Sequence, residues 1–194
     1  QTQAKKLAER SSPRASHYDE TRNFPFVNFD ALFEADLLRL TQGSDTGGLG
    51  FGLAEARAIV SEIARGEPST ALVLAMHYIY HAVGRRAPWN PDSHAFLCRE
   101  SLEGIALINH LRAEPELGTP ARGGLPATTA VRTASGWRIS GDKIYATGSP
   151  LLKYGLAWGK TDDRDPQVGI FDFGDKTIIS ETRGLKSAPF HPTI

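Results

Sequence analysis

The stretch KIYATGSP (residues 143–150) places an aromatic ring and a hydroxyl two residues apart, at Tyr145 and Thr147. Side chains two apart on a strand share a face, so a strand here would present both groups together. An aromatic ring packs against other flat ring systems, and a hydroxyl can hydrogen-bond a ring nitrogen. Gly148 then removes side-chain bulk directly after the pair. Because Tyr and Thr are also ordinary strand residues, the pair predicts either a site for a flat ligand or simply the end of a hairpin.

Two histidines, His77 and His81, stand four residues apart in an apolar segment and share one face of a predicted helix. This is the spacing of a two-histidine metal site, but no carboxylate lies between them and no third ligand is evident. We therefore predict no metal site and favour histidines that line a cavity beside a second domain. The single cysteine, Cys98, cannot form an internal disulfide, and its apolar flanks predict a buried, inert thiol. This use of cysteine fits a reducing, cytoplasmic setting, which is the location we expect.

Two further motifs suggest chemistry that their surroundings do not support. GGLGFG (residues 47–52) has glycines suited to a dinucleotide pyrophosphate, but it follows a helical pattern and a polar loop instead of a strand. We interpret it as a tight connection between helices. DFG (residues 172–174) matches the kinase metal-binding triplet, but the other kinase motifs do not precede it in the required places.

The charge and apolar content of the chain exclude several classes of partner. Its 194 residues include 22 basic and 22 acidic side chains. With no net field to steer a polyanion, we predict neither a nucleic-acid partner nor an anionic membrane partner. The longest apolar block, residues 70–83, is shorter than the roughly 20 residues of a membrane span. Residues 1–20 carry basic side chains without an apolar run behind them, which does not fit a signal peptide.

Up to residue 103, apolar residues recur at three- and four-residue spacing, which is typical of amphipathic helices. The expected helices cover residues 5–10, 29–40 with Asn28 as N-cap, 53–65, a segment that opens after Pro68 with Ser69 as N-cap, and 92–103. The helix over 53–65 is expected to bury the face that carries Leu53, Ala56, Ile59, Val60 and Ile63. The helix that opens at Ser69 is apolar all round, so we expect it in the middle of a bundle.

Beyond Gly118 the period changes to two, which predicts strands. The expected strands lie within 127–134 and over 137–140, 143–147, 153–161, 166–173 and 176–183. Strands that follow a run of helices predict an α+β fold. We place the boundary near residues 105–119, with an all-α N-terminal domain over 1–104 and a β domain over 105–194.

Three stretches together resemble the acyl-CoA dehydrogenase family. Residues 29–78, from FDALFEADLLRL to STALVLAMHY, resemble the helical N-terminal domain of that family. RAEPELGTP (residues 112–120) resembles its Thr-Glu-Pro-x-x-Gly-Ser-Asp flavin loop, and residues 127–150 resemble its hairpin that ends in Lys-x-Trp-Ile-Thr-Asn-Gly. The similarity runs over residues 24–173. It implies that the β domain is mainly antiparallel and barrel-like, and that the chain is truncated before a C-terminal four-helix bundle.

The resemblance implies a flavin site and a role for each matching position. Tyr145 occupies the aromatic position beside the isoalloxazine, and Thr147 the position whose hydroxyl approaches flavin N5. Gly118 and Thr119 match the residues that meet the flavin pyrophosphate. The positions that contact the isoalloxazine, largely through the backbone, correspond to His110, Arg112 and Ala113.

Two positions depart from the family pattern in the flavin loop. Ala113 replaces the usual Thr, so one side-chain hydrogen bond to the ring is lost. Pro120 replaces the usual Asp at the polar end of the loop. Backbone donors are compatible with both changes.

The function that the resemblance implies is α,β-dehydrogenation of an acyl-CoA thioester, an oxidation of a CH–CH donor with hydride transfer to the N5 atom of FAD. The alternative is a reduced-flavin monooxygenase on the same fold, with FMN as a possible cofactor, because such enzymes also carry Tyr-x-Thr-Gly at this hairpin. In that alternative, His77 or His81 lies near the flavin as a polar partner. A non-catalytic fragment is a third alternative. The dehydrogenase base belongs to the C-terminal bundle, so no catalytic residue is named, and the complete protein is expected to be a homodimer or homotetramer.

Overall fold

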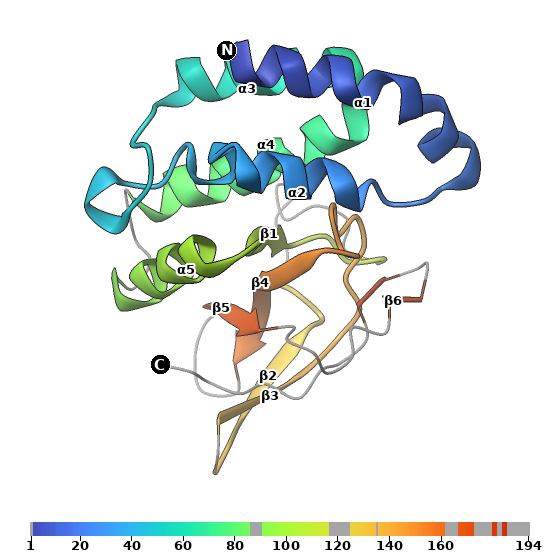
Figure 1. Ribbon diagram of the computed structural model, residues 1–194. Coiled ribbons are helices and arrows are strands. Elements are labelled where there is room, and N and C mark those ends of the chain that lie inside the picture. Colours follow the sequence, from blue (N-terminus) through green and yellow to red (C-terminus); the bar gives the residue numbers. More distant parts are fainter. Residues whose placement is uncertain are drawn as a thin grey trace. The chain divides into compact units, whose positions relative to one another are not determined.

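The computed structural model describes residues 2–85, 91–116, 125–134, 136–161, 167–172, 180–181 and 184–185. These residues divide between two compact units, residues 1–107 and residues 108–194. The first unit is helical, and the second is built mainly on strands (Figure 1). The predicted α+β fold class is therefore confirmed. Among the described residues, no helix combines the length and the hydropathy that a membrane crossing needs.

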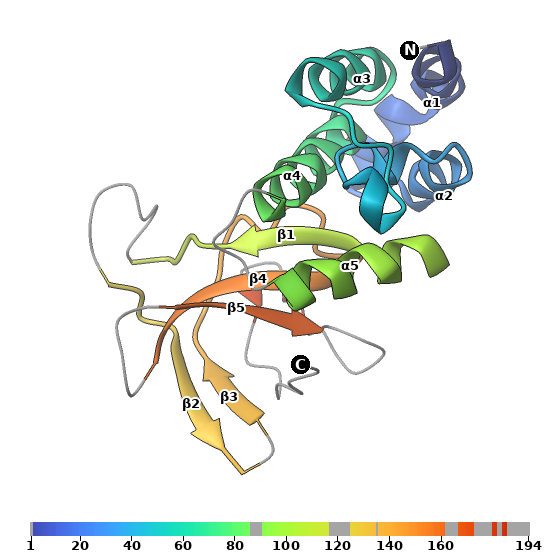
Figure 2. The ribbon, with the colours of Figure 1, turned by 90° about the vertical axis from the view of Figure 1, so that its left-hand side faces the viewer.

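The helical unit contains α-helices joined by short 3-10 turns. Its elements are α1 (Thr2–Thr21), α2 (Phe26–Glu34), η1 (Leu37–Arg39), η2 (Ser44–Thr46), α3 (Leu53–Gly66), α4 (Pro68–Gly84) and α5 (Pro91–Glu103). Helix α1 runs alongside α3 in both ribbon views (Figures 1 and 2). The two helices approach closely at Gly66, because a Cβ there would lie 2.1 Å from the carbonyl oxygen of Ala8. Only glycine fits this contact without a shift of the backbone.

The helix boundaries differ from the predicted ones where local capping was misjudged. Helix α2 begins before Asn28, so this residue is buried inside the helix, where its amide donates to the Thr70 hydroxyl at 3.0 Å. Helix α4 begins at Pro68, and the carboxylate of Glu67 accepts hydrogen bonds from the backbone N–H of Ser69 and Thr70. Glu67 is therefore the N-cap in place of the predicted Ser69. Proline fits at the first helical position because its missing N–H would have no partner there.

Helix α1 is also longer than the predicted residues 5–10, and it accommodates Pro13 in its interior. The predicted apolar face of α3 is largely correct, since Ala56, Ile59 and Ile63 are buried. Leu53 is the exception, with 81% of its surface exposed at the first position of the helix. The apolar pattern therefore predicted the buried face and missed that its N-terminal end is exposed.

Helix α4 supplies much of the core of the helical unit. Its buried residues are Thr70, Ala71, Val73, Leu74, His77, Tyr78 and His81. Its other side carries exposed apolar residues, Leu72, Ile79 and Val83. The helix is thus buried on one face and not surrounded, which corrects the prediction that it lies in the middle of a bundle.

The second unit contains a mixed, open sheet. Its strands are β1 (Leu107–Leu111), β2 (Thr129–Thr133), β3 (Gly136–Ser140), β4 (Leu152–Thr161) and β5 (Gln167–Asp172), in the order β1-β4-β2-β3 with β5 also paired to β4. A separate short pair contains β6 (Ser180–Glu181) and β7 (Gly184–Leu185).

Strand directions show why the sheet is mixed. The pairs β2/β3 and β4/β5 are antiparallel, with Thr129 opposite Ser140 and Tyr154 opposite Asp172. Strands β2 and β4 are parallel, with Thr129 opposite Lys160. The described strands do not close into a barrel, so the barrel-like expectation is corrected to an open sheet.

The predicted strand over residues 143–147 does not form. Lys143 makes a single bridge, and irregular backbone and turns follow until β4 begins at Leu152. The predicted strand over 176–183 is described only at Ser180–Glu181, and its remaining residues lie outside the described part of the chain.

Candidate functional site

The end of β1 lies beside the segment that carries Tyr145 and Thr147. The backbone N–H of Ile144 donates to the carbonyl of Ala113 at 3.0 Å. The side-chain amide of Asn109 donates to the carbonyl of Thr147 at 2.9 Å. These two bonds bracket the predicted site residues and bring two segments more than 30 positions apart in the sequence into direct contact.

The two segments together contain the predicted residues His110, Arg112, Ala113, Tyr145 and Thr147. Asn109 was not predicted from the sequence. Its side-chain oxygen also accepts a hydrogen bond of 2.7 Å from the backbone N–H of His110. Gly118, Thr119 and Pro120 lie outside the described residues, so their placement at a pyrophosphate remains a prediction.

Tyr145 is held in an unusual backbone conformation. Its φ is 56°, in the left-handed region, and the backbone N–H of Thr147 donates to its carbonyl at 2.8 Å. This is a tight turn about Ala146, so the argument that strand alternation puts Tyr145 and Thr147 on one face was wrong. Left-handed backbone costs a bulky residue about 1–3 kcal/mol and is found preferentially at functional sites.

The side chains at this turn are available to a ligand. The Tyr145 ring is 82% exposed. Thr147 is partly exposed, and its hydroxyl makes no hydrogen bond to another described residue. An exposed aromatic ring can pack against a flat heterocyclic cofactor, and an uncommitted hydroxyl can form a hydrogen bond to it. The chemistry of these residues therefore fits the flavin that the family resemblance implies.

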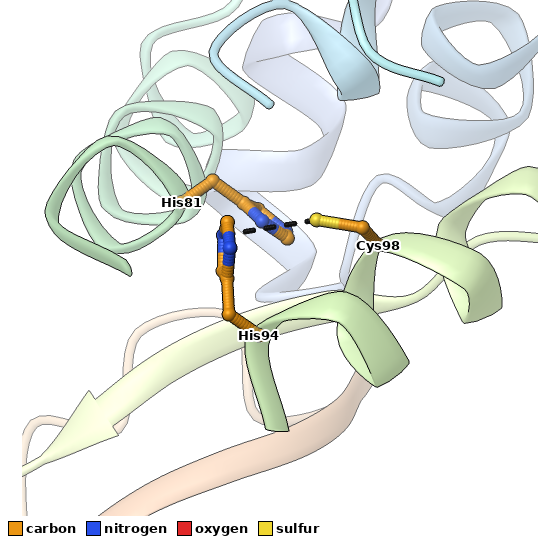
Figure 3. A group of neighbouring side chains, drawn as sticks. All are labelled: His81, His94 and Cys98. Atoms are coloured by element: carbon orange, nitrogen blue, oxygen red, sulfur yellow. Dashed lines mark hydrogen bonds between the residues drawn. The ribbon is translucent and has the colours of Figure 1, made fainter. Parts of the chain in front are cut away.

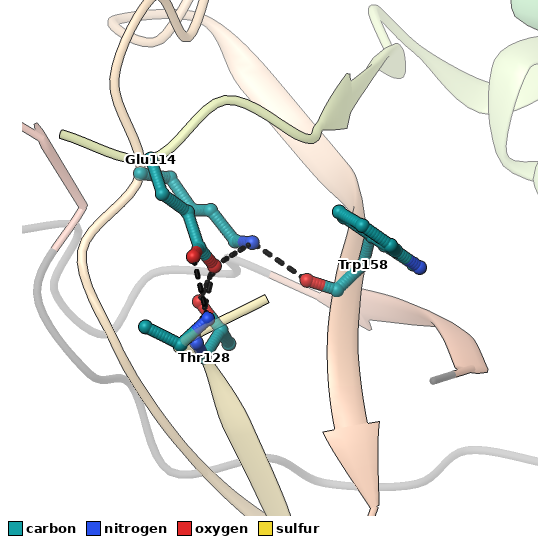
Figure 4. A network of polar contacts seen from close by, with 5 residues as sticks. Glu114, Thr128 and Trp158 are labelled. Carbon is teal, nitrogen blue, oxygen red and sulfur yellow. Dashed lines mark hydrogen bonds and ion pairs between the residues drawn. The ribbon is translucent and has the colours of Figure 1, made fainter. Parts of the chain in front are cut away.

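A buried ion pair joins the same two segments (Figure 4). The ammonium of Lys143 lies 2.7 Å from a carboxylate oxygen of Glu114 and 2.6 Å from the carbonyl of Trp158. The Glu114 carboxylate also accepts from the backbone N–H of Ala127 and Thr128 and from the Thr128 hydroxyl. Both charged side chains are almost fully buried, at 3% and 4% exposed. Sequence reasoning did not single out either residue, because lone charged residues in strand-like segments normally face solvent.

These contacts shift the ionisation of the groups around the site. Burial raises the pKa of Glu114, but the hydrogen bonds from Lys143, Thr128 and Ala127 outweigh it and lower the pKa to about 2. Burial lowers the pKa of Lys143, and its pairing with Glu114 opposes that change. Burial, with the positive charges of Arg112 and Lys143, lowers the pKa of His110 to about 4. His110 is therefore neutral at neutral pH, and the ion pair is charged.

The two histidines of α4 are both fully buried, with ring centroids 4.6 Å apart. Nε2 of His77 lies 2.9 Å from the carbonyl of Leu38 and donates to it, and burial lowers the pKa of His77 to about 4. His81 instead lies near His94 and Cys98 of α5, with one ligand atom of each within 4.8 Å of the others. Cys98 is buried as predicted, but it has two imidazoles for neighbours. A position of His77 or His81 beside the flavin remains a prediction.

Comparison with known proteins shows the family to which the helical unit belongs. Residues 1–84 match the family model described as the acyl-CoA dehydrogenase N-terminal domain. The helical unit is thus a domain of this family, and the predicted resemblance is confirmed.

Curated relatives extend the similarity beyond the helical unit. YdbM of Bacillus subtilis, named as an acyl-CoA dehydrogenase, is 30% identical over 167 residues, which is 86% of this chain and 43% of YdbM. Benzylmalonyl-CoA dehydrogenase of Aromatoleum aromaticum is 30% identical over 84% of this chain and 42% of its own length. The chain therefore spans less than half the length of these relatives.

Solved structures show the same fold. FMN-bound TdsC from Paenibacillus sp. A11-2 superposes with a TM-score of 0.81 at 17% identity, over 97% of this chain and 50% of TdsC. The methanesulfinate monooxygenase MsuC from Pseudomonas fluorescens superposes with a TM-score of 0.76 at 20% identity, over 97% of this chain and 49% of MsuC. The fold is thus shared by acyl-CoA dehydrogenase relatives and by monooxygenases.

Proposed function

We propose that this chain forms part of a flavin-dependent oxidoreductase of the acyl-CoA dehydrogenase type, which oxidises the α,β bond of an acyl-CoA thioester. The observation that carries the proposal is the exposed ring of Tyr145, held at φ 56° beside the main chain that runs from His110 to Ala113. The dehydrogenase names of YdbM and the benzylmalonyl-CoA enzyme support this reaction and a CoA thioester as the substrate class.

The residues of this chain bind and orient the cofactor. The Tyr145 ring would pack against the isoalloxazine, and the Thr147 hydroxyl would donate a hydrogen bond to it. The main chain of His110, Arg112 and Ala113 borders the ring system. When bound, the flavin supplies the acceptor for the hydride that leaves the substrate β-carbon. No residue of this chain is assigned as the base that takes the α-proton.

The ion pair Glu114–Lys143 has a positioning role in this proposal. It holds Ala113 against Ile144, and so it fixes the start of the turn at Tyr145–Thr147 relative to β1. Rigid placement matters because a flat cofactor loses packing area and hydrogen-bond geometry when its contacts move by even a fraction of an ångström. FAD is the proposed cofactor, in line with the dehydrogenase resemblance.

A second function is favoured by one specific feature, the sequence Tyr145-Ala146-Thr147-Gly148 at the turn. The resemblance to monooxygenases rests on this motif, and FMN-bound TdsC and MsuC share the fold. The alternative is therefore a reduced-flavin monooxygenase, with FMN as the cofactor and a sulfur, nitrogen or aromatic centre as the substrate. Homo-oligomeric assembly belongs to both proposals.

One experiment separates the two reactions. The gene's full product, loaded with flavin, is mixed anaerobically with saturated acyl-CoA thioesters of several chain lengths. Dehydrogenation predicts loss of the oxidised flavin absorbance and formation of the α,β-unsaturated thioester. Unchanged absorbance with every thioester, together with substrate-dependent oxygen uptake by the reduced enzyme, would select the monooxygenase. A product that binds flavin but performs neither reaction would contradict both.

A further inference from the structure

Two imidazoles and a thiol meet inside the helical unit. His81 comes from α4, and His94 and Cys98 come from α5 (Figure 3). All three are buried, with 0%, 8% and 0% of their surfaces exposed. His94 and Cys98 are four residues apart, so one face of α5 presents both toward His81. One ligand atom from each residue lies within 4.8 Å of the other two.

The spacing of the ligand atoms is close to that of a tetrahedral metal site. Nε2 of His94 lies 3.7 Å from Sγ of Cys98. Zinc bonds of about 2.3 Å to sulfur and about 2.0 Å to nitrogen, at a tetrahedral angle, separate the two atoms by roughly 3.5 Å. The pair would have to move by only a few tenths of an ångström to share an ion. A weak S–H···N hydrogen bond gives a similar distance, so this contact alone does not distinguish the two.

A second observation comes from His81, whose buried Nδ1 has no hydrogen-bond partner among the described residues. Its other nitrogen, Nε2, lies 3.3 Å from the side-chain amide of Gln42. If that amide group donated to Nε2, Nδ1 would carry a buried N–H with nothing to accept it. Buried polar groups are rarely left in this state.

The proton count around Ser101 resolves the orientation of the Gln42 amide. The Ser101 hydroxyl lies 2.8 Å from the amide oxygen of Gln42 and 2.6 Å from the carbonyl of Cys98, but it has one hydrogen to donate. When the Gln42 amide is turned by 180°, the amide N–H of Gln42 donates to the Ser101 hydroxyl, and this hydroxyl donates to the Cys98 carbonyl. The amide oxygen of Gln42 then accepts a hydrogen bond from Nε2–H of His81. The Ser101 hydroxyl, the Gln42 amide oxygen and Nε2 of His81 then each have a partner. Nδ1 of His81 is left with a free lone pair, which is the form that a metal ligand requires.

The surroundings also hold the other ligands in place. His94 is hydrogen-bonded to the main chain of His81, which fixes its ring, and metal-bound histidines are commonly oriented by such a bond. Burial lowers the pKa of both His81 and His94. Burial raises the pKa of the Cys98 thiol. Of the charged groups nearby, Arg85 opposes a cation and Asp45 favours it.

We propose that His81, His94 and Cys98 bind one divalent transition-metal ion of the zinc type, through two imidazole nitrogens and one thiolate. The ion bonds to Nδ1 of His81, to Nε2 of His94 and to Sγ of Cys98, and the thiol proton is released to solvent. Two imidazoles and a thiolate suit zinc better than magnesium or calcium, which prefer oxygen ligands. The site ties α4 to α5, and it does not depend on the flavin proposal.

Cobalt(II) is the direct probe, because a thiolate ligand gives it a charge-transfer band and tetrahedral geometry gives it strong visible bands. Cys98 is the single cysteine of the 194-residue chain, so a charge-transfer band in the cobalt difference spectrum can arise only there. Titration of the chain is expected to give both features, to saturate near one equivalent and to reverse on addition of Zn²⁺. Cys98→Ser is expected to remove the charge-transfer band, and His94→Gln to weaken cobalt binding at least tenfold.

The matched control is His17→Gln, which removes an exposed histidine on α1 and is expected to leave the titration unchanged. A pale octahedral spectrum without the charge-transfer band would overturn the proposal, because it would indicate binding to surface carboxylates. Loss of the cobalt spectrum in His17→Gln would also overturn the proposal, because the ion would then bind at the exposed histidine.

A measurement on the unmodified chain covers variants that fail to fold. Calorimetric titration with Zn²⁺ in two buffers of different ionisation enthalpy counts the protons released. Loss of the Cys98 thiol proton on thiolate formation predicts release of about one proton per zinc ion near neutral pH. Zinc binding with no proton release, or no zinc binding, would contradict the site.

Discussion

The ammonium of Lys143 and the carboxylate of Glu114 lie 2.7 Å apart in the interior of the second unit, and this pair joins the end of β1 to the turn that carries Tyr145. Four donor groups converge on the Glu114 carboxylate, from Ala127, Thr128 and Lys143. A charge this deep in a protein is tolerated only when its hydrogen bonds replace those of water. The ion pair is thus a structural centre of the candidate site.

Removal of the negative charge is expected to destabilise the fold strongly. Glu114→Gln leaves the Lys143 ammonium buried without its counter-charge, which costs about 3–5 kcal/mol of unfolding free energy. Urea denaturation followed by circular dichroism measures this change. Adding Lys143→Met to Glu114→Gln is expected to recover part of the loss, and the exposed control Glu9→Gln should change stability by less than about 0.5 kcal/mol. Equal stability of Glu114→Gln and wild type would contradict the buried pair.

The same carboxylate predicts a loss of stability in acid. Its folded pKa of about 2 lies below the ordinary value of 4.5, so its contribution is complete above pH 4.5 and is lost as pH falls from there toward 2. Between about pH 6 and pH 3, this group alone removes about 2 kcal/mol of unfolding free energy. Urea denaturation at both pH values should show a larger acid loss for wild type than for Glu114→Gln. Identical pH dependence of the two proteins would show that Glu114 is not the responsible group.

The left-handed backbone of Tyr145 predicts a difference in stability between two replacements of this residue. Tyr145→Gly removes the cost of the left-handed conformation, whereas Tyr145→Ala removes the ring and keeps that cost. We therefore expect the glycine variant to be about 1 kcal/mol more stable than the alanine variant. Thermal unfolding measured at matched concentrations tests this. An alanine variant as stable as the glycine variant would show that the residue does not need a positive φ.

The close approach of α1 and α3 is tested at Gly66. Gly66→Ala would place a methyl group 2.1 Å from the Ala8 carbonyl oxygen, so the helices must move apart. Overpacking of this kind costs about 1–3 kcal/mol. Gly104→Ala is the control, because a Cβ at Gly104 meets nothing within 4 Å. Comparable stability of the two variants would contradict the observed helix contact.

The helical unit was largely predictable because its apolar residues repeat with the helical period. Ile59 and Ile63 are buried as the pattern of α3 predicts. The errors lie at the helix ends, where a single hydrogen bond decides the boundary. At α4 the buried carboxylate of Glu67 caps the helix, whereas the sequence pattern predicted Ser69 as the cap.

The candidate site was less predictable because it depends on contacts between distant segments. Strand alternation suggested that Tyr145 and Thr147 belong together, but the structure forms a tight turn at Tyr145 instead of a strand. The partnership of Glu114 with Lys143 spans 29 positions and leaves no local pattern. The same holds for His81 and the His94–Cys98 pair, which come from different helices. The i,i+4 spacing of His94 and Cys98 was the local signal that could have indicated a shared face.

The central claim is that the turn at Tyr145 binds a flavin, and equilibrium titration of the chain with FAD and with FMN tests it most directly. Saturable binding of one of the two, with a perturbed flavin spectrum, is the predicted result. Tyr145→Ala is expected to weaken that binding at least tenfold, and Thr147→Val to weaken it less while leaving stability unchanged. Tyr18→Ala, a change on α1, should bind like wild type. Absence of binding by either flavin, or equal affinity of wild type and Tyr145→Ala, would contradict the account.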